Sequence, residues 1–291
     1  MELIAPLPGV ETFCVVEDPP PGARAGLTVL VMHGGLGLDH GYLRPSLSFL
    51  SAVARVVYYD HRGNGRSRNS AGAGLSHAVL AADAEALAQH LGADELVVLG
   101  HSYGSFVALE YALQRPARLR GLILCNSTPA LDYPEVLGAL LAQRGTADQR
   151  AALLQLLQAP PASDAEFARL WRLALPLYFH QQRDSAGYDA LAAQVRCRAA
   201  AFVEANRDNV PVYDVNARLG EVGVPTLVIA GEHDLFFPPA QGAARLIAGI
   251  PGAELALFAE SGHHPFLEEP ERFRSVVLDF LARLPPGGRA S

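Results

Sequence analysis

Short apolar runs alternate with helical patterns over most of this chain. Runs with the length and composition of β-strands occur at 11–17, 27–32, 54–59, 95–99, 119–125, 226–230 and 254–258. Helical patterns stand between or after them, at 76–91, 105–114, 239–250 and 270–284. This alternation predicts an α/β protein whose mostly parallel central sheet has helices on both faces.

The pattern changes between about residue 131 and residue 213, where only helical segments are found. Helices are expected at 146–157, from Ser163 towards Leu175, and at 187–205, with Ser163 and Glu166 forming a capping box. This block, rich in Leu, Ala, Tyr and Phe, predicts a helical cap inserted into the core. The expected division is a first core part at 1–129, the cap at 130–215 and a second core part at 216–291.

Composition narrows the class of protein. The 291 residues are 50% hydrophobic and carry a net charge of −7, enough chain for a sizeable core. No basic stretch with interleaved aromatics is present, so we expect no nucleic-acid partner. The N-terminus lacks a basic start followed by an apolar run, which predicts neither a signal peptide nor a membrane span. Cys14, Cys125 and Cys197 are widely spaced, which favours a reducing compartment and the cytoplasm.

The segment Gly100–His101–Ser102–Tyr103–Gly104 is the first chemical signal. It matches Gly-x-Ser-x-Gly and lies between a predicted strand and a predicted helix. A sharp turn there holds the serine in a strained conformation and needs glycine on both sides. We predict that Ser102 is a nucleophile. The alternative is a glycine-rich turn with an idle serine.

A serine nucleophile needs a base, and the base needs an orienting acid. The carboxyl ends of parallel strands meet at one edge of a sheet, so His and Asp just after strands are the candidates. Asp234 follows the strand ending at residue 230, and His263 follows the strand ending at residue 258. We predict Asp234 as the acid and His263 as the base, with Glu232 and His264 as the alternatives. His101, beside the serine, is expected to pack.

The remaining site residues concern charge stabilisation and substrate contact. Attack on a carbonyl builds an oxyanion that needs fixed N–H donors. The predicted donors are the backbone N–H groups of Tyr103, directly after the nucleophile, and Gly35, in the glycine-rich loop at 33–37. Glycines there let the backbone approach a substrate closely, so Gly34 is expected to contact it. No His, Cys and carboxylate set has metal-ligand spacing, so neither a metal nor another cofactor is expected.

Three segments together resemble the α/β-hydrolase superfamily, over nearly the whole chain outside the cap. More narrowly, Met32–Leu43 is similar to the HGGPG loop of proline iminopeptidases and tricorn-interacting aminopeptidases, the S33 peptidase group. Asp60–Ser67 resembles their DxRGxGxS element, and Gly100–Ser105 resembles their nucleophile segment. Leu36 stands where the group usually has proline. Such loops also occur in esterases, lactonases and carbon–carbon bond hydrolases. We expect hydrogen bonds of Asp60 and Arg62 to make 60–67 a rigid loop.

The resemblance implies a carboxylate in the cap that binds the free α-amino group of a substrate, because a buried ammonium must be paired. Glu204 is the chosen anchor, since it lies near a helix C-terminus and shortly before Tyr213–Asp214–Val215. A solvated surface glutamate is the alternative. The other acidic residues of the cap are Glu135, Glu166, Asp184, Asp189, Asp208 and Asp214.

These observations predict a serine hydrolase that forms an acyl-enzyme with a small-molecule or short-peptide substrate, without indicating an oligomeric state. The first expectation is an aminopeptidase similar to proline iminopeptidase. The alternatives are a carboxylesterase or lactonase and a carbon–carbon bond hydrolase. The alternative from a different class of function is a signalling protein that binds a small molecule and turns it over slowly or not at all. The core is expected to determine the reaction and the cap to determine the substrate.

Overall fold

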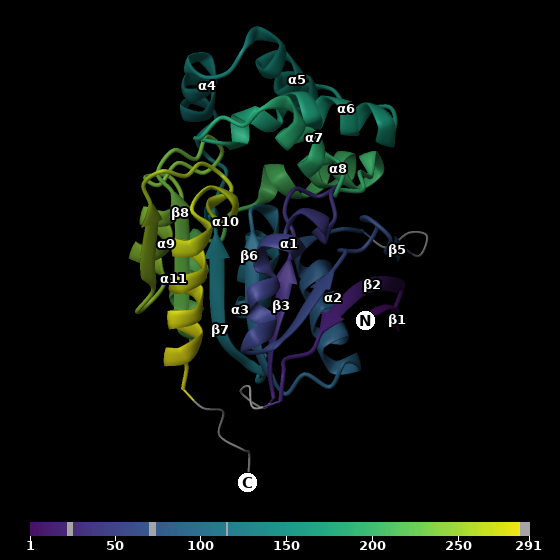
Figure 1. Ribbon diagram of the computed structural model, residues 1–291, viewed down its shortest axis with the longest axis vertical. Helices are drawn as coiled ribbons and strands as arrows, with labels where there is room; N and C mark the ends of the chain where they lie inside the picture. The colour runs from purple at the N-terminus through teal and green to yellow at the C-terminus, as the bar shows by residue number, and fades with distance from the viewer. Residues whose placement is uncertain (22–25, 70–73, 115, 286–291) are drawn as a thin grey trace.

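The computed structural model describes residues 1–21, 26–69, 74–114 and 116–285. A central sheet runs through it, with the strand order β1-β2-β4-β3-β6-β7-β8-β9 and β5 paired to β2 (Figure 1). The strands are β1 (Glu2–Leu7), β2 (Val10–Glu17), β3 (Leu27–Met32), β4 (Arg55–Tyr59), β5 (Arg68–Asn69), β6 (Glu95–His101), β7 (Leu119–Cys125), β8 (Thr226–Gly231) and β9 (Glu254–Phe258). Neighbouring strands are parallel from β4 through β3, β6, β7 and β8 to β9. Strand β2 pairs antiparallel with β1, β4 and β5. The predicted, mostly parallel sheet is confirmed.

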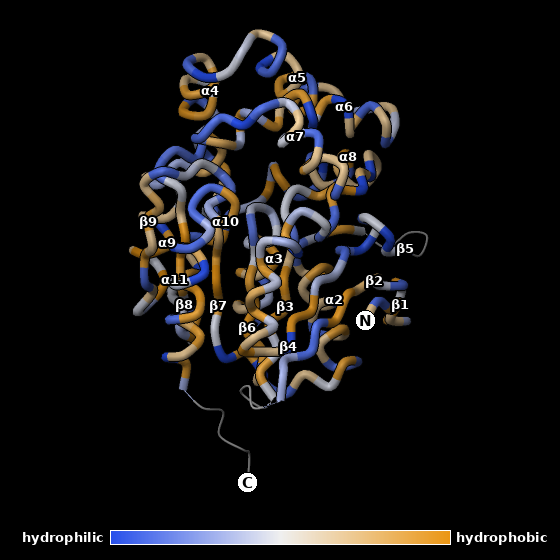
Figure 2. The backbone as a smooth tube through the Cα atoms, viewed as in Figure 1, coloured by the Kyte–Doolittle hydropathy of each residue, from blue (hydrophilic) through white to orange (hydrophobic). Residues whose placement is uncertain are grey.

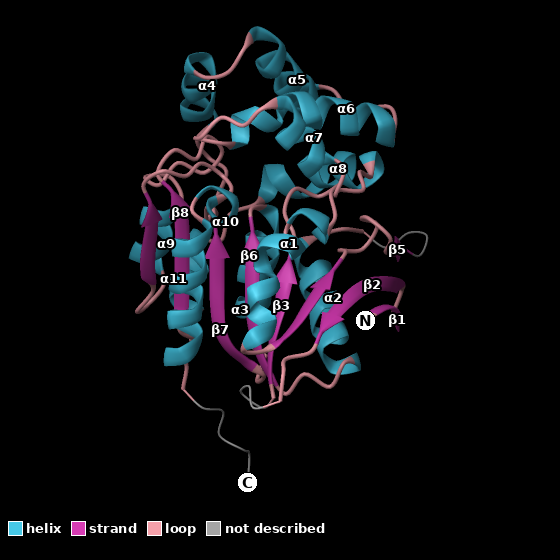
Figure 3. Cartoon of the chain, viewed as in Figure 1, coloured by secondary structure: helices cyan, strands magenta, loops and turns pink. Residues whose placement is uncertain are grey.

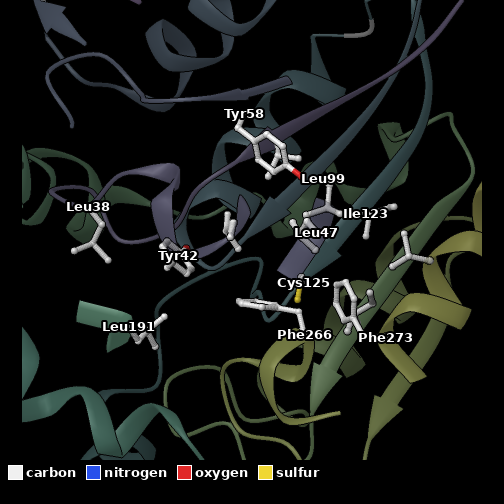
Figure 4. Packing of buried hydrophobic residues seen from close by; sticks show 14 of the residues in the cluster. Leu38, Tyr42, Leu47, Tyr58, Leu99, Ile123, Cys125, Leu191, Phe266 and Phe273 are labelled. Atoms are coloured by element: carbon white, nitrogen blue, oxygen red, sulfur yellow. The ribbon is translucent and has the colours of Figure 1, made fainter. Parts of the chain in front are cut away.

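Helices cover both faces of this sheet. On one face lie α2 (His77–His90), α3 (Tyr103–Leu113) and α9 (Ala243–Gly249); on the other lie α1 (Arg44–Leu47) and α11 (Pro270–Arg283). The strands between them are strongly apolar (Figure 2), and Leu47, Leu99, Ile123 and Phe273 pack together on the α1 side (Figure 4). Burial of this apolar surface on both faces is the main force that holds the layers together.

Strands β3 and β6 are neighbours, and the chain leaves them in opposite directions. After β3 it passes through α1 to β4, and after β6 it passes through α3 to β7 on the other side. The loops that follow two such strands diverge and leave a crevice at the carboxyl edge of the sheet. The glycine-rich loop at 33–37 and the Ser102 turn therefore lie side by side at this crevice.

A layer of helices between β7 and β8 lies over the carboxyl edge (Figure 3). Its helices are α4 (Pro134–Gln143), α5 (Ala147–Gln158), α6 (Asp164–Ala174), α7 (Ser185–Ala192), α8 (Ala199–Glu204) and a π-helical turn η4 (Ala205–Asn209). We call this layer the cap. The chain enters and leaves it side by side, because Ala130 and Asp214 form an antiparallel bridge and Val215 N donates to Pro129 O at 2.9 Å.

The shorter elements are α10 (Pro265–Glu268) and five 3₁₀ turns: η1 (His40–Tyr42), η2 (Ser48–Ala52), η3 (Leu175–Tyr178), η5 (Val210–Val212) and η6 (Asn216–Glu221). Within the part of the chain that the structure describes, no helix has the length and apolar character to cross a membrane.

The prediction of one long helix at 187–205 is wrong. Helix α7 ends at Ala192 and α8 begins at Ala199. Between them Arg198 is extended, and its N–H donates to Gly37 O at 2.7 Å in the core. Asp164 Oδ1 then accepts from Ala199 N at 2.8 Å. Contacts with the core and with α6 thus replace the hydrogen bonds of a continuous helix.

Helix starts were predicted less well than strand ends. Helix α9 begins at Ala243 rather than near residue 239, because Gly242 has a non-helical backbone. Helix α3 begins two residues earlier than expected, at Tyr103. The capping box at Ser163 is only half formed: Ser163 accepts from Glu166 N, but the Glu166 carboxylate accepts from Ala162 N. Strand β1 was not predicted.

Candidate active site

Ser102 lies at the turn between β6 and α3. Its backbone has φ 55° and ψ −126°, a combination that non-glycine residues rarely adopt. The turn is held by Ser102 N, which donates to Cys125 O at 2.9 Å, and by Ser105 Oγ, which donates to Gly100 O at 2.7 Å. A Cβ atom at Gly100 or Gly104 would collide with backbone atoms, so both glycines of the motif are sterically required.

Asp234 and His263 form a buried pair beside this turn. His263 Nδ1 lies 2.9 Å from Asp234 Oδ2 and 3.1 Å from Oδ1. Burial alone raises the pKa of Asp234, but the charge and hydrogen bonds of His263, with further donors, bring that pKa below its usual value. An ionised carboxylate only accepts, so Nδ1 carries the proton. Ser102 and His263 line the same cavity.

The structure does not bring the alternative residues into this arrangement. His264 stacks on Phe179, with ring centroids 4.9 Å apart, and burial holds its pKa well below the usual range. Glu232 is exposed. The buried carboxylate–imidazole pair beside the Ser102 turn is therefore Asp234 with His263.

Asn126 was not singled out in the sequence. It follows β7 directly and has a left-handed backbone, with φ 50°. Its Nδ2 donates to Asp234 Oδ2 at 2.7 Å and to Gly262 O at 3.0 Å, so one side chain holds both the acid and the loop that carries the base. Like Asp234, Asn126 lies just after the carboxyl end of a buried strand, and this position could have marked it as a site residue in the sequence.

The loop that carries His263 is also tied to the cap. His263 N donates to Tyr178 O at 2.7 Å. The carboxylate of Glu268 accepts from Gly262 N at 2.7 Å and from His180 N and Gln181 N, both at 2.8 Å. Burial raises the pKa of Glu268, while these N–H groups counteract that effect. His263 is therefore held in position through contacts with both the core and the cap.

The loop at 33–37 approaches the serine very closely. A Cβ atom on Gly34 would lie 2.8 Å from both Ser102 Cβ and Tyr42 Oη, so only glycine fits. Gly34 N already donates to Tyr42 Oη at 2.8 Å. Gly35, the next residue of this loop, has φ 35° and lines the cavity. The second predicted donor, Tyr103 N, belongs to the first residue of α3, where an N–H has no acceptor within the helix.

His101 is buried and packs against aromatic rings, as expected, and it also forms hydrogen bonds. Both of its ring nitrogens are hydrogen-bonded, Nδ1 with Tyr42 Oη at 2.7 Å and Nε2 with His263 O at 2.9 Å. Burial lowers the pKa of His101 to about 3, which keeps the ring neutral.

The loop at 60–67 makes the hydrogen bonds expected of it. Asp60 Oδ2 accepts from Arg66 N at 2.8 Å, and Arg62 forms two hydrogen bonds with Asp83, at 2.6 and 2.7 Å. Asn64 Oδ1 accepts from Gly37 N, which ties this loop to the glycine-rich loop. It is a rigid support behind the site.

A cavity of about 310 Å³ lies between the carboxyl edge and the cap, and Gly34, Gly35, Ser102, Tyr103 and His263 line it. The rest of its wall is almost entirely apolar or aromatic. Among the described residues that line it there is no Asp, Glu, Lys or Arg. The cap and its connecting segments contribute Leu131, Tyr133, Pro134, Leu137, Leu153, Leu156, Leu157, Phe167, Trp171, Tyr178, Phe202, Ala205, Asn206 and Val210.

Glu204 does not line this cavity, although Phe202, Ala205 and Asn206 beside it do. Its carboxylate accepts from Leu75 N at 3.1 Å, between the cap and the core. The prediction that Glu204 binds the substrate amine is therefore wrong. Its side chain instead connects the cap to the core. Spacing along the sequence does not tell on which side of the helix a carboxylate lies.

Cys14, Cys125 and Cys197 are free cysteines. In the ranges described, no group of three or more His, Cys, Asp and Glu residues is placed to hold a metal ion. Cys125 is buried next to Asn126, and burial raises the pKa of its thiol well above the usual value.

The family model for the alpha/beta hydrolase fold matches residues 28–270, and the chain belongs to this family. The chain is 31% identical over 276 residues to RutD of Variovorax paradoxus, a protein named as a proposed carbamate hydrolase, covering 92% of this chain and 96% of the relative. It is 27% identical over 274 residues to the proline iminopeptidase of Saccharolobus solfataricus, with 87% and 84% covered.

Among solved structures, the proline iminopeptidase of Mycobacterium smegmatis superposes with a TM-score of 0.76 at 27% identity, covering 97% of this chain and 98% of the other. The predicted fold and the resemblance to proline iminopeptidases are confirmed. The family and the names of these relatives support hydrolase activity.

Proposed function

We propose that this chain is a serine hydrolase in which Ser102, His263 and Asp234 act together. His263 Nε2 takes the serine proton as Oγ attacks the substrate carbonyl carbon, and Asp234 orients the ring. The N–H groups of Gly35 and Tyr103 stabilise the oxyanion. The bond to the leaving group breaks as His263 returns the proton to it. Water, deprotonated by His263, then attacks the acyl-enzyme and releases the carboxylic acid and free Ser102.

The proposed substrate class follows from the residues that line the cavity. A peptide with a free α-amino group would bring an ammonium ion into the cavity, and burying it without a partner is costly. No described residue of the lining offers a carboxylate, while leucines and aromatic rings form most of the wall. We therefore propose an ester of a neutral, apolar carboxylic acid as the substrate. The similarity to proline iminopeptidases makes an aminopeptidase the second candidate.

A substrate series separates these candidates. We expect kcat/KM for p-nitrophenyl esters to rise by about fourfold per added methylene, from about 0.8 kcal/mol of burial each, until the cavity is filled. Proline p-nitroanilide should be a poor substrate, and Ser102→Ala should abolish turnover of both. A p-nitrophenyl carbamate should be included because of the names of the relatives.

Each unexpected result points to a different function. Higher kcat/KM for proline p-nitroanilide than for every ester would establish the aminopeptidase, and preference for the carbamate would establish a carbamate hydrolase. If no substrate is turned over and a fluorophosphonate does not label Ser102, the chain is a binding protein rather than an enzyme.

A further inference from the structure

A chain of three buried hydrogen bonds runs past the nucleophile. Gly34 N and Tyr42 Oη are 2.8 Å apart, Tyr42 Oη and His101 Nδ1 are 2.7 Å apart, and His101 Nε2 and His263 O are 2.9 Å apart. The side chains of Tyr42 and His101 are almost completely buried. One end of this series of hydrogen bonds is the loop that contains Gly35, a proposed oxyanion donor, and the other end is the backbone of His263, the proposed base.

The direction of every proton in this chain follows from its two ends. The carbonyl of His263 only accepts, so His101 Nε2 carries a proton and donates it. The N–H of Gly34 only donates, so Tyr42 Oη accepts from it. The hydroxyl proton of Tyr42 must then go to His101 Nδ1, which is an acceptor only in the neutral ring. The low pKa of His101 agrees with this state.

We propose that Tyr42 and His101 are positioning residues that set the oxyanion loop and the base at their working distance on either side of Ser102. This inference rests on the proposed serine hydrolase function. His101 directly precedes Ser102, so the middle of this series of hydrogen bonds is covalently joined to the nucleophile turn. By occupying Gly34 N, Tyr42 also holds the backbone next to Gly35, which lines the cavity. A small displacement of such a donor weakens oxyanion stabilisation, because the donors must be aimed at the position of the developing charge.

The comparison with Tyr58 separates positioning from packing. Tyr58 is another fully buried tyrosine of the same core, and both side chains are labelled in Figure 4. Its hydroxyl has no hydrogen-bond partner in the described structure. The core thus tolerates an unpartnered tyrosine hydroxyl, whereas the hydroxyl of Tyr42 is bonded on both sides.

The experiment compares Tyr42→Phe with Tyr58→Phe as the matched control. For Tyr42→Phe we expect kcat on a p-nitrophenyl ester to fall by about 10- to 100-fold, somewhat less than for complete loss of an oxyanion donor, with KM within about threefold of wild type. Affinity for a trifluoromethyl ketone, whose adduct needs the oxyanion donors, should fall in parallel. Tyr58→Phe should retain wild-type values of all three quantities.

A second pair tests the other member of the chain. Gln at position 101 can still donate an amide N–H towards His263 O, whereas Leu cannot. We expect kcat in the order wild type, His101→Gln, His101→Leu, and we expect Tyr42→Phe to add little to His101→Leu, because both changes break the same chain. If Tyr42→Phe does not fold, the comparison of His101→Gln with His101→Leu still tests the positioning role.

The outcomes distinguish the two levels of the proposal. Wild-type protein that neither turns over esters nor reacts with a fluorophosphonate would refute the serine hydrolase function itself. Wild-type protein that does both, with Tyr42→Phe indistinguishable from Tyr58→Phe, would overturn the positioning role alone. Equal kcat for His101→Gln and His101→Leu would do the same.

Discussion

Asn126→Asp is a nearly isosteric change that tests how the acid–base pair is held. In the wild type, Asn126 Nδ2 donates to Asp234 Oδ2 at 2.7 Å and to Gly262 O at 3.0 Å. Aspartate has almost the same shape and also tolerates the left-handed backbone of this position, where φ is 50°. The substitution therefore replaces both amide N–H donors with a second carboxyl group against Asp234, with almost no change in volume.

The magnitude follows from the two bonds that are lost. A hydrogen bond to a buried carboxylate contributes about 1.5–3 kcal/mol, and a neutral one about 1 kcal/mol. Asn126→Ala, which loses both without adding charge, should be destabilised by about 3 kcal/mol at neutral pH, with about 1 kcal/mol more from alanine in a left-handed conformation. In Asn126→Asp, a protonated carboxyl group can still donate to Asp234, so the loss is smaller while that proton is kept.

The sign of the pH dependence can be worked out. Burial and the charge of Asp234 both raise the folded-state pKa of the introduced aspartate above its unfolded value of about 3.9. A raised folded pKa contributes stability that is present at low pH and lost as the pH rises through it. The stability difference between wild type and Asn126→Asp should therefore widen from about pH 5.5 to about pH 8, and kcat/KM should fall over the same range relative to wild type.

Urea unfolding of the three proteins at both pH values measures these differences, with ester hydrolysis as the second readout. A difference for Asn126→Asp that is the same at both pH values would refute the reasoning. So would an Asn126→Asp protein as stable as wild type at the higher pH, because two ionised carboxylates cannot share this buried site without cost.

Two further substitutions test the base and the oxyanion loop. His263→Ala should lower kcat by about 10⁴- to 10⁶-fold, as loss of a triad base does, while His264→Ala should retain far more activity; the reverse order in ester hydrolysis would show that the base is misassigned. Gly34→Ala should abolish most activity, because its Cβ would lie 2.8 Å from Ser102 Cβ. The matched control is Gly138→Ala in helix α4, where an added Cβ would meet no neighbouring group within 4 Å. This control should keep full activity and gain up to about 1 kcal/mol of stability. Wild-type turnover by Gly34→Ala would mean that the loop moves away from the serine.

Local signals are enough for the strands and the ends at which the chemistry lies. Strand β3 has the predicted bounds, and every one of its residues is buried. Ser102, Asp234 and His263 each follow a strand of this sheet within a few residues, and parallel pairing brings those strand ends to one edge. Their approach could therefore be predicted without knowledge of any individual contact.

The remaining features depend on contacts between distant parts of the chain. The break after α7 needs Gly37 O to accept from Arg198 N, and the true role of Glu204 depends on Leu75 N. Neither contact leaves a periodic pattern in the sequence. The bonds of Tyr42 with Gly34 and His101 likewise join segments that meet only after the sheet has formed.

The expected division of labour, with reaction in the core and substrate choice in the cap, is incomplete. The cap residue Asn209 donates to Tyr103 Oη at 2.6 Å, on the residue whose N–H is a proposed oxyanion donor. Tyr178 O, also in the cap, accepts from the backbone N–H of His263. Two of the groups proposed to act on the substrate are thus held partly by the helices that enclose it. A change in the cap wall can therefore alter the chemical step as well as binding, since the same helices supply both.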